Sequence, residues 1–256
     1  MTDTTAAGRT GMPTDVVVDS VSLAFDSSPL FEDFSAVYPG GQTTCLLGPS
    51  GIGKSTLLRA MAGLVPLNGG TIRDSTGRPL AGRIAYMDQS DLLLPWLTAR
   101  DNVALGTRLR GERPDRAAAD RLLARVGLTG HETKRPAALS GGMRQRVALA
   151  RTLMEDRPIV LMDEPFSAVD ALTRFRLQDL ACDVLADRTV VMVTHDPQEA
   201  LRLGHRLFVL TGSPARLDES PVPAAPTPRA PTRGDFPARY RDLMSRLGAD
   251  ETGVNA

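Results

Sequence analysis

The sequence predicts an α/β fold, and three observations support that class. Short apolar runs alternate with stretches of helical periodicity along most of the chain. The runs at 159–162, 190–193 and 207–210 are apolar throughout, as expected for parallel strands that are covered on both faces. A glycine-rich turn, Gly48–Ser55, leads from a strand pattern into a helix pattern. Strands that alternate with helices in this way are typical of an α/β core.

The composition excludes several functional classes. The 256 residues contain 30 Lys and Arg against 30 Asp and Glu, so the chain lacks the basic excess that nucleic-acid binding usually needs. The first residues show no apolar signal region, and no apolar run reaches the ~18 residues that cross a bilayer. Cys45 and Cys182 lie far apart, as do the three histidines, so we expect no local metal cluster and a reduced, cytoplasmic setting.

Local signals mark the ends of several elements. The run 43–47 stops at Gly48, Gly63 ends the helix that follows, and Thr98 with Asp101 forms a capping-box signature. In chain order, we expect strands at 16–25 (one strand or a strand pair), 43–47, 83–87, 159–162, 190–193 and 207–210, and helices at 55–62, from 98 onward, and at 115–126, 140–154, 172–185 and 197–203.

The end of the chain differs in composition. Residues 213–233 contain six prolines, which indicates an extended and mobile linker. The C-terminal tail at 234–256 contains a helix pattern, Phe236–Leu247, with apolar residues on one face. Three interpretations of the tail stay open: it docks on the rest of the protein, regulates it, or is disordered.

The turn Gly48–Ser55 fits the phosphate-binding pattern G-x-x-x-x-G-K-[ST] in full. Glycines let the backbone curl so that successive N–H groups face phosphate oxygens, and the following helix adds the positive end of its dipole. Lys54, one of only two lysines in the chain, is a compact charge that can reach the β- and γ-phosphates, and Ser55 can bind Mg²⁺. A glycine-rich turn without a ligand is the alternative.

Two acids, Asp163 and Glu164, follow the apolar strand 159–162. An acid at the carboxyl end of such a strand can face a phosphate-bound metal, so Asp163 is a candidate Mg²⁺ ligand. Glu164 is a candidate to orient or deprotonate an attacking water. An ordinary surface Asp-Glu pair is the alternative, and it fits less well beside a phosphate-binding loop.

The segment Leu139–Arg146 resembles the LSGGQ signature of ATP-binding cassette (ABC) ATPases, with Met143 in place of the usual Gln. Two glycines at a helix start cost about 1 kcal/mol each in helix propensity, which is understandable if that helix end approaches a ligand closely. Ser140 can act as an N-cap, as a ligand contact or as both. The resemblance extends from about Val16 to Leu210.

The resemblance implies a role for further residues. Gln89 resembles the Q-loop glutamine, 167–170 resembles the D-loop with Val169 in place of Leu, and His195 resembles the switch histidine. Phe25 stands where the family places an aromatic residue that stacks on adenine, and a core Phe is the competing interpretation. The implied catalytic residues are Glu164, His195 and Gln89, and the implied metal ligands are Ser55, Gln89 and Asp163. The implied nucleotide-binding residues are Phe25, Gly48, Pro49, Ser50, Gly51, Ile52, Gly53, Lys54, Ser55, Thr56, Ser140, Gly141, Gly142 and Asp170.

The resemblance also implies a P-loop NTPase fold of the ABC ATPase type, in which a RecA-like core carries an antiparallel β subdomain and an inserted helical subdomain. The expected divisions are a flexible N-terminus at 1–14, a nucleotide-binding core at 15–88 and 156–212, and a helical subdomain with the signature at 89–155. Family members form head-to-tail homodimers that bind ATP with Mg²⁺ between the P-loop of one copy and the signature of the other, so hydrolysis is gated by closure.

A transporter role would require separate membrane subunits. The interval between Lys54 and Ser140 is too short for the long coiled coil of DNA-repair relatives, and translation-type relatives carry two cassettes in one chain. Leu92–Trp96 resembles the LLPW segment of importers for nitrate, sulfonate, taurine and thiamine-type pyrimidine precursors. Met87–Asp91 and Leu203–Arg206 look most like ATPases of the hydroxymethylpyrimidine subgroup.

We therefore expect an ATP-hydrolysing ABC importer subunit at the cytoplasmic face of the membrane. Its expected partners are two transmembrane permease subunits, an extracytoplasmic substrate-binding protein and a second copy of itself. Residues 92–96 would receive a short helix of the membrane subunit, or else form an ordinary core patch. A soluble, non-transport ABC ATPase with an assembly or scaffold role is the alternative function.

Overall fold

The computed structural model of the chain describes residues 13–25 and 28–253, and the side chains of Phe25 and of 248–253 are outside this description. Most of the N-terminal segment expected to be flexible, 1–14, therefore lies outside the described residues. Of that segment, Thr14 is described, and its carbonyl accepts a hydrogen bond from the Thr189 hydroxyl at 2.9 Å.

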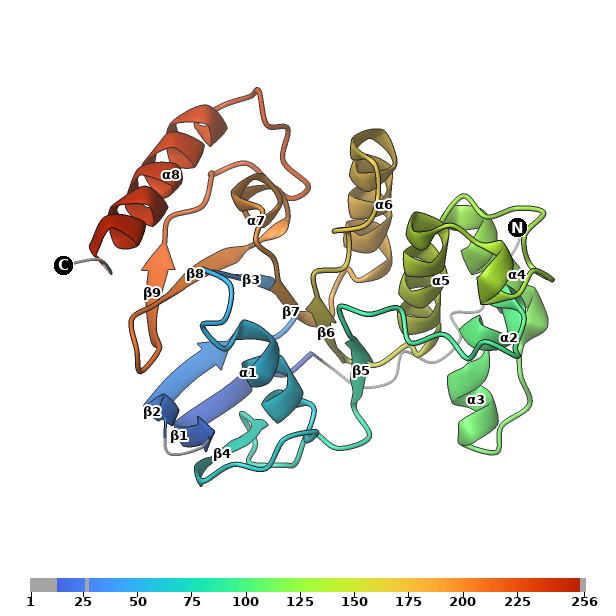
Figure 1. Cartoon of the computed structure of the whole chain (residues 1–256), viewed down its shortest axis with the longest axis horizontal. Helices are drawn as coiled ribbons and strands as arrows, with labels where there is room; N and C mark the ends of the chain where they lie inside the picture. Colours follow the sequence, from blue (N-terminus) through green and yellow to red (C-terminus); the bar gives the residue numbers. More distant parts are fainter. Residues whose placement is uncertain (1–12, 26–27, 254–256) are drawn as a thin grey trace, which may run out of the picture.

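Two sheets make up the β structure (Figure 1). The larger has the order β5 (Ile84–Met87), β6 (Ile159–Asp163), β7 (Thr189–Val193), β3 (Thr43–Leu47), β8 (Arg206–Thr211) and β9 (Arg216–Ser220). Its first five strands are parallel, and β9 is antiparallel to β8. The smaller sheet is antiparallel, with β1 (Val16–Phe25) between β2 (Ser28–Tyr38) and β4 (Gly69–Asp74). A mostly parallel sheet with a separate antiparallel one confirms the α/β class.

The helices divide between the two faces of the larger sheet. They are α1 (Lys54–Met61), α2 (Ala99–Val103), α3 (Leu105–Leu109), α4 (Arg116–Arg125), α5 (Gly141–Met154), α6 (Ala171–Val184), α7 (Pro197–Leu203) and α8 (Phe236–Gly253), with a short 3₁₀ turn at Pro136–Ala138. α1 lies beside the antiparallel sheet, whereas α2 to α5 form a helical block on the opposite side of the molecule (Figure 1).

The parallel strands are buried on both faces, as their unbroken apolar sequences predict. Alternate residues belong to two different cores, because successive side chains of a strand point to opposite faces. Leu46, Leu161 and Val193 pack in the core that α1 shares with the antiparallel sheet. Cys45 and Met192 pack in the core on the other face, together with apolar residues of the remaining helices.

The expected ends of several helices are confirmed. Thr98 is the N-cap of α2, and its hydroxyl accepts a hydrogen bond from the Asp101 N–H. Ser140 is the N-cap of α5, which runs to Met154 as predicted. Strand β4 was missed because Gly69-Gly70 is typical of a turn. In the structure Gly70 has φ +79°, and a Cβ there would lie 2.3 Å from the Ser20 carbonyl oxygen, so only glycine fits.

The proline-rich segment is not a mobile linker along its whole length. Residues 215–220 are free of proline, and β9 forms there on the edge of the larger sheet, where each N–H is available for pairing. After β9 the chain runs back along α7. This part, which we call the C-terminal arm (residues 221–253), ends in α8, whose Phe236 and Leu243 are buried in the same core as Leu201. The described part of the tail therefore docks on the rest of the protein, and a regulatory role of the tail stays a prediction.

Arg229 fastens the arm to α7. Its Nη1 donates hydrogen bonds to the carbonyls of Leu201 at 2.8 Å and Gly204 at 2.6 Å, and its Nε donates to the Ala225 carbonyl at 2.7 Å. The first two carbonyls lie at the C-terminal end of α7, where backbone acceptors lack partners within the helix and a cation is favourable.

Among the described residues, no helix is both long enough and apolar enough to cross a membrane.

We predict that Arg229→Met lowers the free energy of unfolding by about 2–3 kcal/mol, because the substitution leaves buried carbonyls unpaired. Arg241→Met is the matched control: Arg241 is exposed on α8, makes one hydrogen bond within its own helix, and should change the free energy by less than about 0.5 kcal/mol. Urea unfolding of both variants measures the difference. Equal stabilities of the two would contradict the role of Arg229.

Candidate functional site

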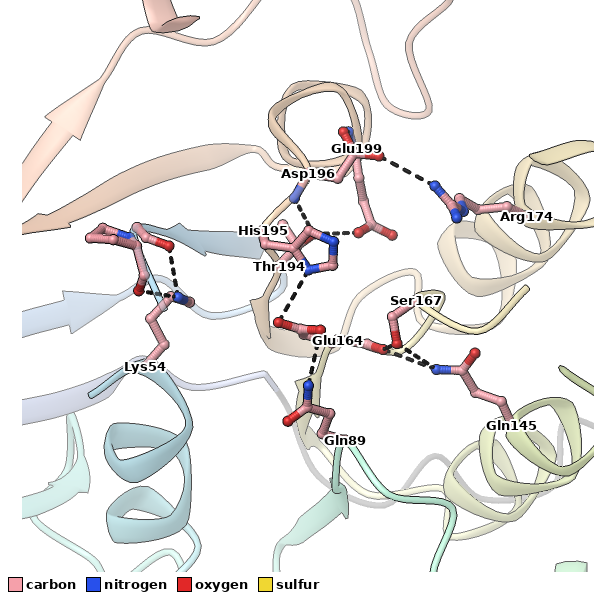
Figure 2. A network of polar contacts seen from close by, with 12 residues as sticks. Lys54, Gln89, Gln145, Glu164, Ser167, Arg174, Thr194, His195, Asp196 and Glu199 are labelled. Carbon is pink, nitrogen blue, oxygen red and sulfur yellow. Dashed lines mark hydrogen bonds and ion pairs between the residues drawn. The ribbon is translucent and has the colours of Figure 1, made fainter. Parts of the chain in front are cut away.

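The phosphate-loop motif forms the connection between β3 and α1. Gly51 has φ +84° and Gly53 has φ +103°, conformations that glycine adopts without steric cost. Lys54 is the first residue of α1 and is buried, and its Nζ donates to the carbonyls of Gly48 at 2.7 Å and Pro49 at 2.8 Å. The loop thus closes around the lysine ammonium (Figure 2). Burial lowers the pKa of Lys54, and the nearby carboxylates of Glu164 and Asp163 oppose that effect.

Asp163, the last residue of β6, is a buried carboxylate. Its exposed fraction is 1%, and within the part of the chain that the structure describes neither of its carboxylate oxygens has a hydrogen-bond partner. Burial raises its pKa, and the Ser55 hydroxyl, which lies close without forming a hydrogen bond, acts in the opposite direction. An unpaired buried carboxylate is costly, and a hard divalent cation is the natural partner for it.

The residues around Asp163 fit Mg²⁺ better than a transition metal. Among the described residues, no group of three or more His, Cys, Asp and Glu side chains is arranged to hold a metal ion. A cation here would rely on oxygen from Asp163 and Ser55 and on water or phosphate, which is the usual situation of Mg²⁺ beside phosphates.

Glu164 joins two of the other predicted residues. One carboxylate oxygen lies 3.1 Å from His195 Nδ1, and the other accepts a hydrogen bond from Gln89 Nε2 at 3.2 Å (Figure 2). Gln89 follows β5, Glu164 follows β6 and His195 follows β7, so three neighbouring parallel strands deliver the three side chains. The sequence prediction that these residues act together is therefore consistent with their positions.

The backbone of Glu164 has an uncommon conformation. Its φ is +48°, in the left-handed region that non-glycine residues rarely adopt. Such a conformation costs on the order of 1–3 kcal/mol and persists only where the surroundings hold it. The Glu164 N–H donates to the Val193 carbonyl at 2.9 Å, which ties this residue to the end of β7.

A small polar cavity lies behind Glu164 and His195. Its volume is about 20 Å³, enough for a single water molecule. On its far side Glu199 is buried, and its carboxylate accepts hydrogen bonds from the Thr194 hydroxyl and from Gln178 Nε2. Burial raises the pKa of Glu199. These hydrogen bonds connect Thr194, the residue before His195, to Glu199 of α7 and through it to Gln178 of α6.

The signature segment lies away from the phosphate loop of the same chain. Ser140 is exposed at the start of α5, a helix that lies apart from α1 (Figure 1), and its hydroxyl accepts a hydrogen bond from Met143 N at 3.3 Å. A Cβ on Gly142 would lie 2.9 Å from the Ala168 carbonyl oxygen, so the glycine allows α5 to contact the segment after Glu164. One copy of the chain therefore does not bring the loop and the signature together.

Two further predicted residues have different outcomes. Asp170 is the N-cap of α6, accepts a hydrogen bond from Thr173 N at 3.0 Å, and has a pKa lowered by its hydrogen bonds to Thr173. Phe25 ends β1, and its side chain lies outside the described residues, so the choice between adenine stacking and core packing stays a prediction.

One polar residue near the site was not predicted. Gln145 of α5 is buried, and its amide contacts the segment 164–168 through three hydrogen bonds. The only sequence signal was an uncharged polar residue within a helix that otherwise buries apolar side chains, which is too common to single out a site.

The fold and the site together define a class of protein. The structure contains a phosphate loop on a parallel sheet, a separate antiparallel sheet, and a helical block whose last helix begins with a Ser-Gly-Gly turn. These are the parts of an ATP-binding cassette ATPase. The model of the family described as ABC transporter matches residues 31–167 of this chain, which is more than half of it. The chain therefore belongs to this family. It is accordingly an ATP-binding ATPase.

Known proteins agree with this assignment. An uncharacterized ABC transporter ATP-binding protein of Haemophilus influenzae is 41% identical over 92% of this chain and 100% of its own length. The aliphatic sulfonates import ATP-binding protein SsuB 2 of Burkholderia cenocepacia is 44% identical over 88% of this chain and 87% of its own length. The dimeric ATP-binding cassette MJ0796, in a post-hydrolysis state bound to ADP and Pi, has a TM-score of 0.72 at 28% identity and covers 80% of this chain and 98% of that one.

We predict that Asp163→Asn raises the stability of the nucleotide-free protein while it removes the response to Mg²⁺. Replacing the unpaired buried charge by a neutral amide should add on the order of 1 kcal/mol, because a neutral group costs less to bury than a charge. Asp88→Asn is the opposite control, because Asp88 is paired with Arg59 at 3.1 Å and its neutralisation should destabilise the protein. Thermal unfolding with ATP, with and without Mg²⁺, checks both expectations. A lower Tm for nucleotide-free Asp163→Asn would contradict the prediction.

Proposed function

We propose that the chain is the ATP-hydrolysing subunit of an ABC importer and that Glu164, Gln89 and His195 form its hydrolytic centre. The observation that carries this proposal is the Glu164 carboxylate, which contacts His195 and Gln89 one residue after the buried, unpaired Asp163. Hydrolysis of a γ-phosphate needs a positioned water, a partner for the phosphate charge and a cation, and these side chains supply or hold all three.

Each residue then has a defined task. The loop Gly48–Thr56 binds the phosphates, with Lys54 as the charge that approaches the β- and γ-phosphates. Ser55, Asp163 and Gln89 would hold Mg²⁺, and the bound ion would supply positive charge to the phosphate oxygens. Glu164 accepts the proton of the attacking water, and His195 donates a hydrogen bond to the γ-phosphate. Phe25 stacks on adenine.

A second copy of the chain completes the site. Ser140, Gly141 and Gly142 lie at an exposed helix start that does not face the phosphate loop of its own copy, and a helix N-terminus favours anions. In a head-to-tail homodimer these residues, with Asp170 of the next loop, contact the ATP bound by the other copy. The dimeric state of the MJ0796 cassette supports this arrangement.

The surface at Leu92 and Trp96 is proposed to bind the membrane subunits. The exposed fractions are 60% for Leu92 and 65% for Trp96, whereas Leu93 is buried. The alternative of a core patch fits the buried Leu93, and Leu94 is partly buried. Leu92 has φ +45°, and the carbonyls of Asp91 and Leu92 accept hydrogen bonds from Arg151 of α5 at 2.7 Å and 2.8 Å. An apolar pair held outward in this way suits a short amphipathic helix of a permease.

The transported compound belongs in the nitrate, sulfonate, taurine or pyrimidine-precursor group. Several relatives of 40–47% identity carry names that specify import of aliphatic sulfonates, which favours a small sulfonate. In this proposal the chain works at the cytoplasmic face of the membrane with two permease subunits and an extracytoplasmic binding protein.

We predict that Glu164→Gln binds Mg·ATP with unchanged affinity and loses turnover by about 100-fold or more, because the amide cannot accept the proton of water. Thermal stabilisation by Mg·ATP measures binding, since a ligand that binds only the folded state raises its stability by mass action. Phosphate release measures turnover. Turnover near the level of the unchanged protein would remove Glu164 from the proposed role.

We predict that a cysteine at position 92 or 96 forms crosslinks to cytoplasmic loops of the permease in membranes that contain the whole transporter. Leu64→Cys is the control, because Leu64 is an equally exposed apolar residue, at 62%, on a different part of the surface. Crosslinks of all three, or of none in any nucleotide state, would reject the docking surface. Co-purification without any membrane protein would favour the non-transport alternative.

A further inference from the structure

Gln145 is a buried amide that none of the proposed roles uses. It belongs to α5, the helix that begins at the signature, and its exposed fraction is 5%. Its Nε2 donates to the Glu164 carbonyl oxygen at 3.1 Å and to the Ser167 hydroxyl at 3.2 Å, and its Oε1 accepts a hydrogen bond from Ala168 N at 2.8 Å (Figure 2). All three hydrogen bonds go to the loop that follows β6.

One of these hydrogen bonds acts directly on the backbone of Glu164, whose φ lies in the uncommon left-handed region. The Ser167 hydroxyl donates to the same Glu164 carbonyl at 3.1 Å, so two side chains hold this oxygen. The Glu164 N–H is held by Val193 from the other side. A left-handed φ persists where neighbouring groups fix the peptide, and here the side chains of Gln145 and Ser167 add to two backbone hydrogen bonds, from Ser167 N to the Glu164 carbonyl at 3.3 Å and from Glu164 N to Val193.

The direction of the Glu164 side chain depends on this backbone. With φ at +48°, the carboxylate reaches both His195 and Gln89. Relaxation of the peptide toward the usual negative φ would turn the side chain away from these contacts. A displacement of about 1 Å in a reacting group is enough to slow a reaction ~100-fold.

We propose that Gln145 is a positioning residue for ATP hydrolysis: it holds the Glu164 peptide in the left-handed conformation and so links the signature helix to the catalytic base. This inference rests on the proposed function of Glu164. It gives α5 a second task, since the helix that presents Ser140 to the partner's ATP also holds the base that acts on the ATP of its own copy.

Other contacts of α5 support a rigid connection. Gly142 brings the helix against the Ala168 carbonyl, one residue from the Ser167 contact of Gln145. Further along the same helix, Arg144 Nε donates to the Asp91 carboxylate at 2.8 Å, and Arg151 binds the carbonyls of residues 91 and 92. A movement of α5 relative to the larger sheet would therefore reach the Glu164 peptide through Gln145.

The test compares turnover and ATP binding in variants of the full chain. Gln145→Leu removes all three hydrogen bonds, and Gln145→Glu keeps the acceptor for Ala168 N but removes both donors. We expect kcat to fall by about 10- to 100-fold in both, with the KM for ATP and the thermal stabilisation by Mg·ATP within about twofold of the unchanged protein. A merely structural role would lower stability and ATP binding together and would not lower kcat alone.

Two further variants sharpen the result. Thr152→Val is the matched control: Thr152 is buried on the same helix, donates only to the Ala148 carbonyl within α5, and its replacement should leave kcat unchanged. Ser167→Ala removes the other side-chain donor to the Glu164 carbonyl and leaves the Ser167 N–H in place. Ser167 is exposed, so this variant remains testable if Gln145→Leu does not fold. Ser167→Ala should lower kcat, and its effect should not multiply with that of Gln145→Glu, because both act on one oxygen.

The outcomes separate this inference from the proposed function. If Glu164→Gln is inactive while Gln145→Leu and Ser167→Ala keep full kcat, the inference is overturned and the function stands. If Gln145→Leu lowers kcat no more than Thr152→Val does, the inference is likewise overturned. If Glu164→Gln itself hydrolyses ATP normally, the proposed function fails and takes this inference with it.

Discussion

The alignment of four neighbouring parallel strands determines the whole site. β5, β6, β7 and β3 run in the same direction, so their carboxyl ends meet at one edge of the sheet. Each strand ends in one functional group: Gln89, the Asp163-Glu164 pair, His195 and the phosphate loop. Apolar burial on both faces keeps the register of these strands. A shift of one residue would move each side chain from one core to the other.

Much of the fold was readable from the sequence, because buried parallel strands and capped helices leave strong local signals. The strand at 43–47 and the helix at 197–203 were predicted to the residue. The elements that were missed have weaker signals: β2 is interrupted by Glu32-Asp33, β4 begins with two glycines, and β9 lies between prolines. The last two depend on tertiary pairing, which local propensity does not encode.

The site was predictable to the extent that motifs carry it. Motifs pointed to Lys54, Asp163 and Glu164, and the family resemblance added His195 and the reason to connect them. The left-handed backbone of Glu164 and the amide of Gln145 that holds it were not readable, because both depend on how α5 packs against the loop after β6. In the proposed assembly, helix α5 contacts the docking surface, the catalytic loop and, by its exposed start, a second copy of the chain. A helix with contacts to all three regions is well placed to make hydrolysis depend on assembly.

The order of strands in the larger sheet also has a consequence for biosynthesis. β3 is made early, but its hydrogen-bonded neighbours β7 and β8 belong to the last third of the chain. Pairs so distant in sequence close slowly, since a long loop must be ordered before the contact forms. A ribosome-bound fragment that ends before residue 189 thus leaves the backbone N–H and C=O groups on both edges of β3 without their partner strands, and it cannot present a finished nucleotide pocket. The nascent chain therefore depends on protection from aggregation until its final strands emerge.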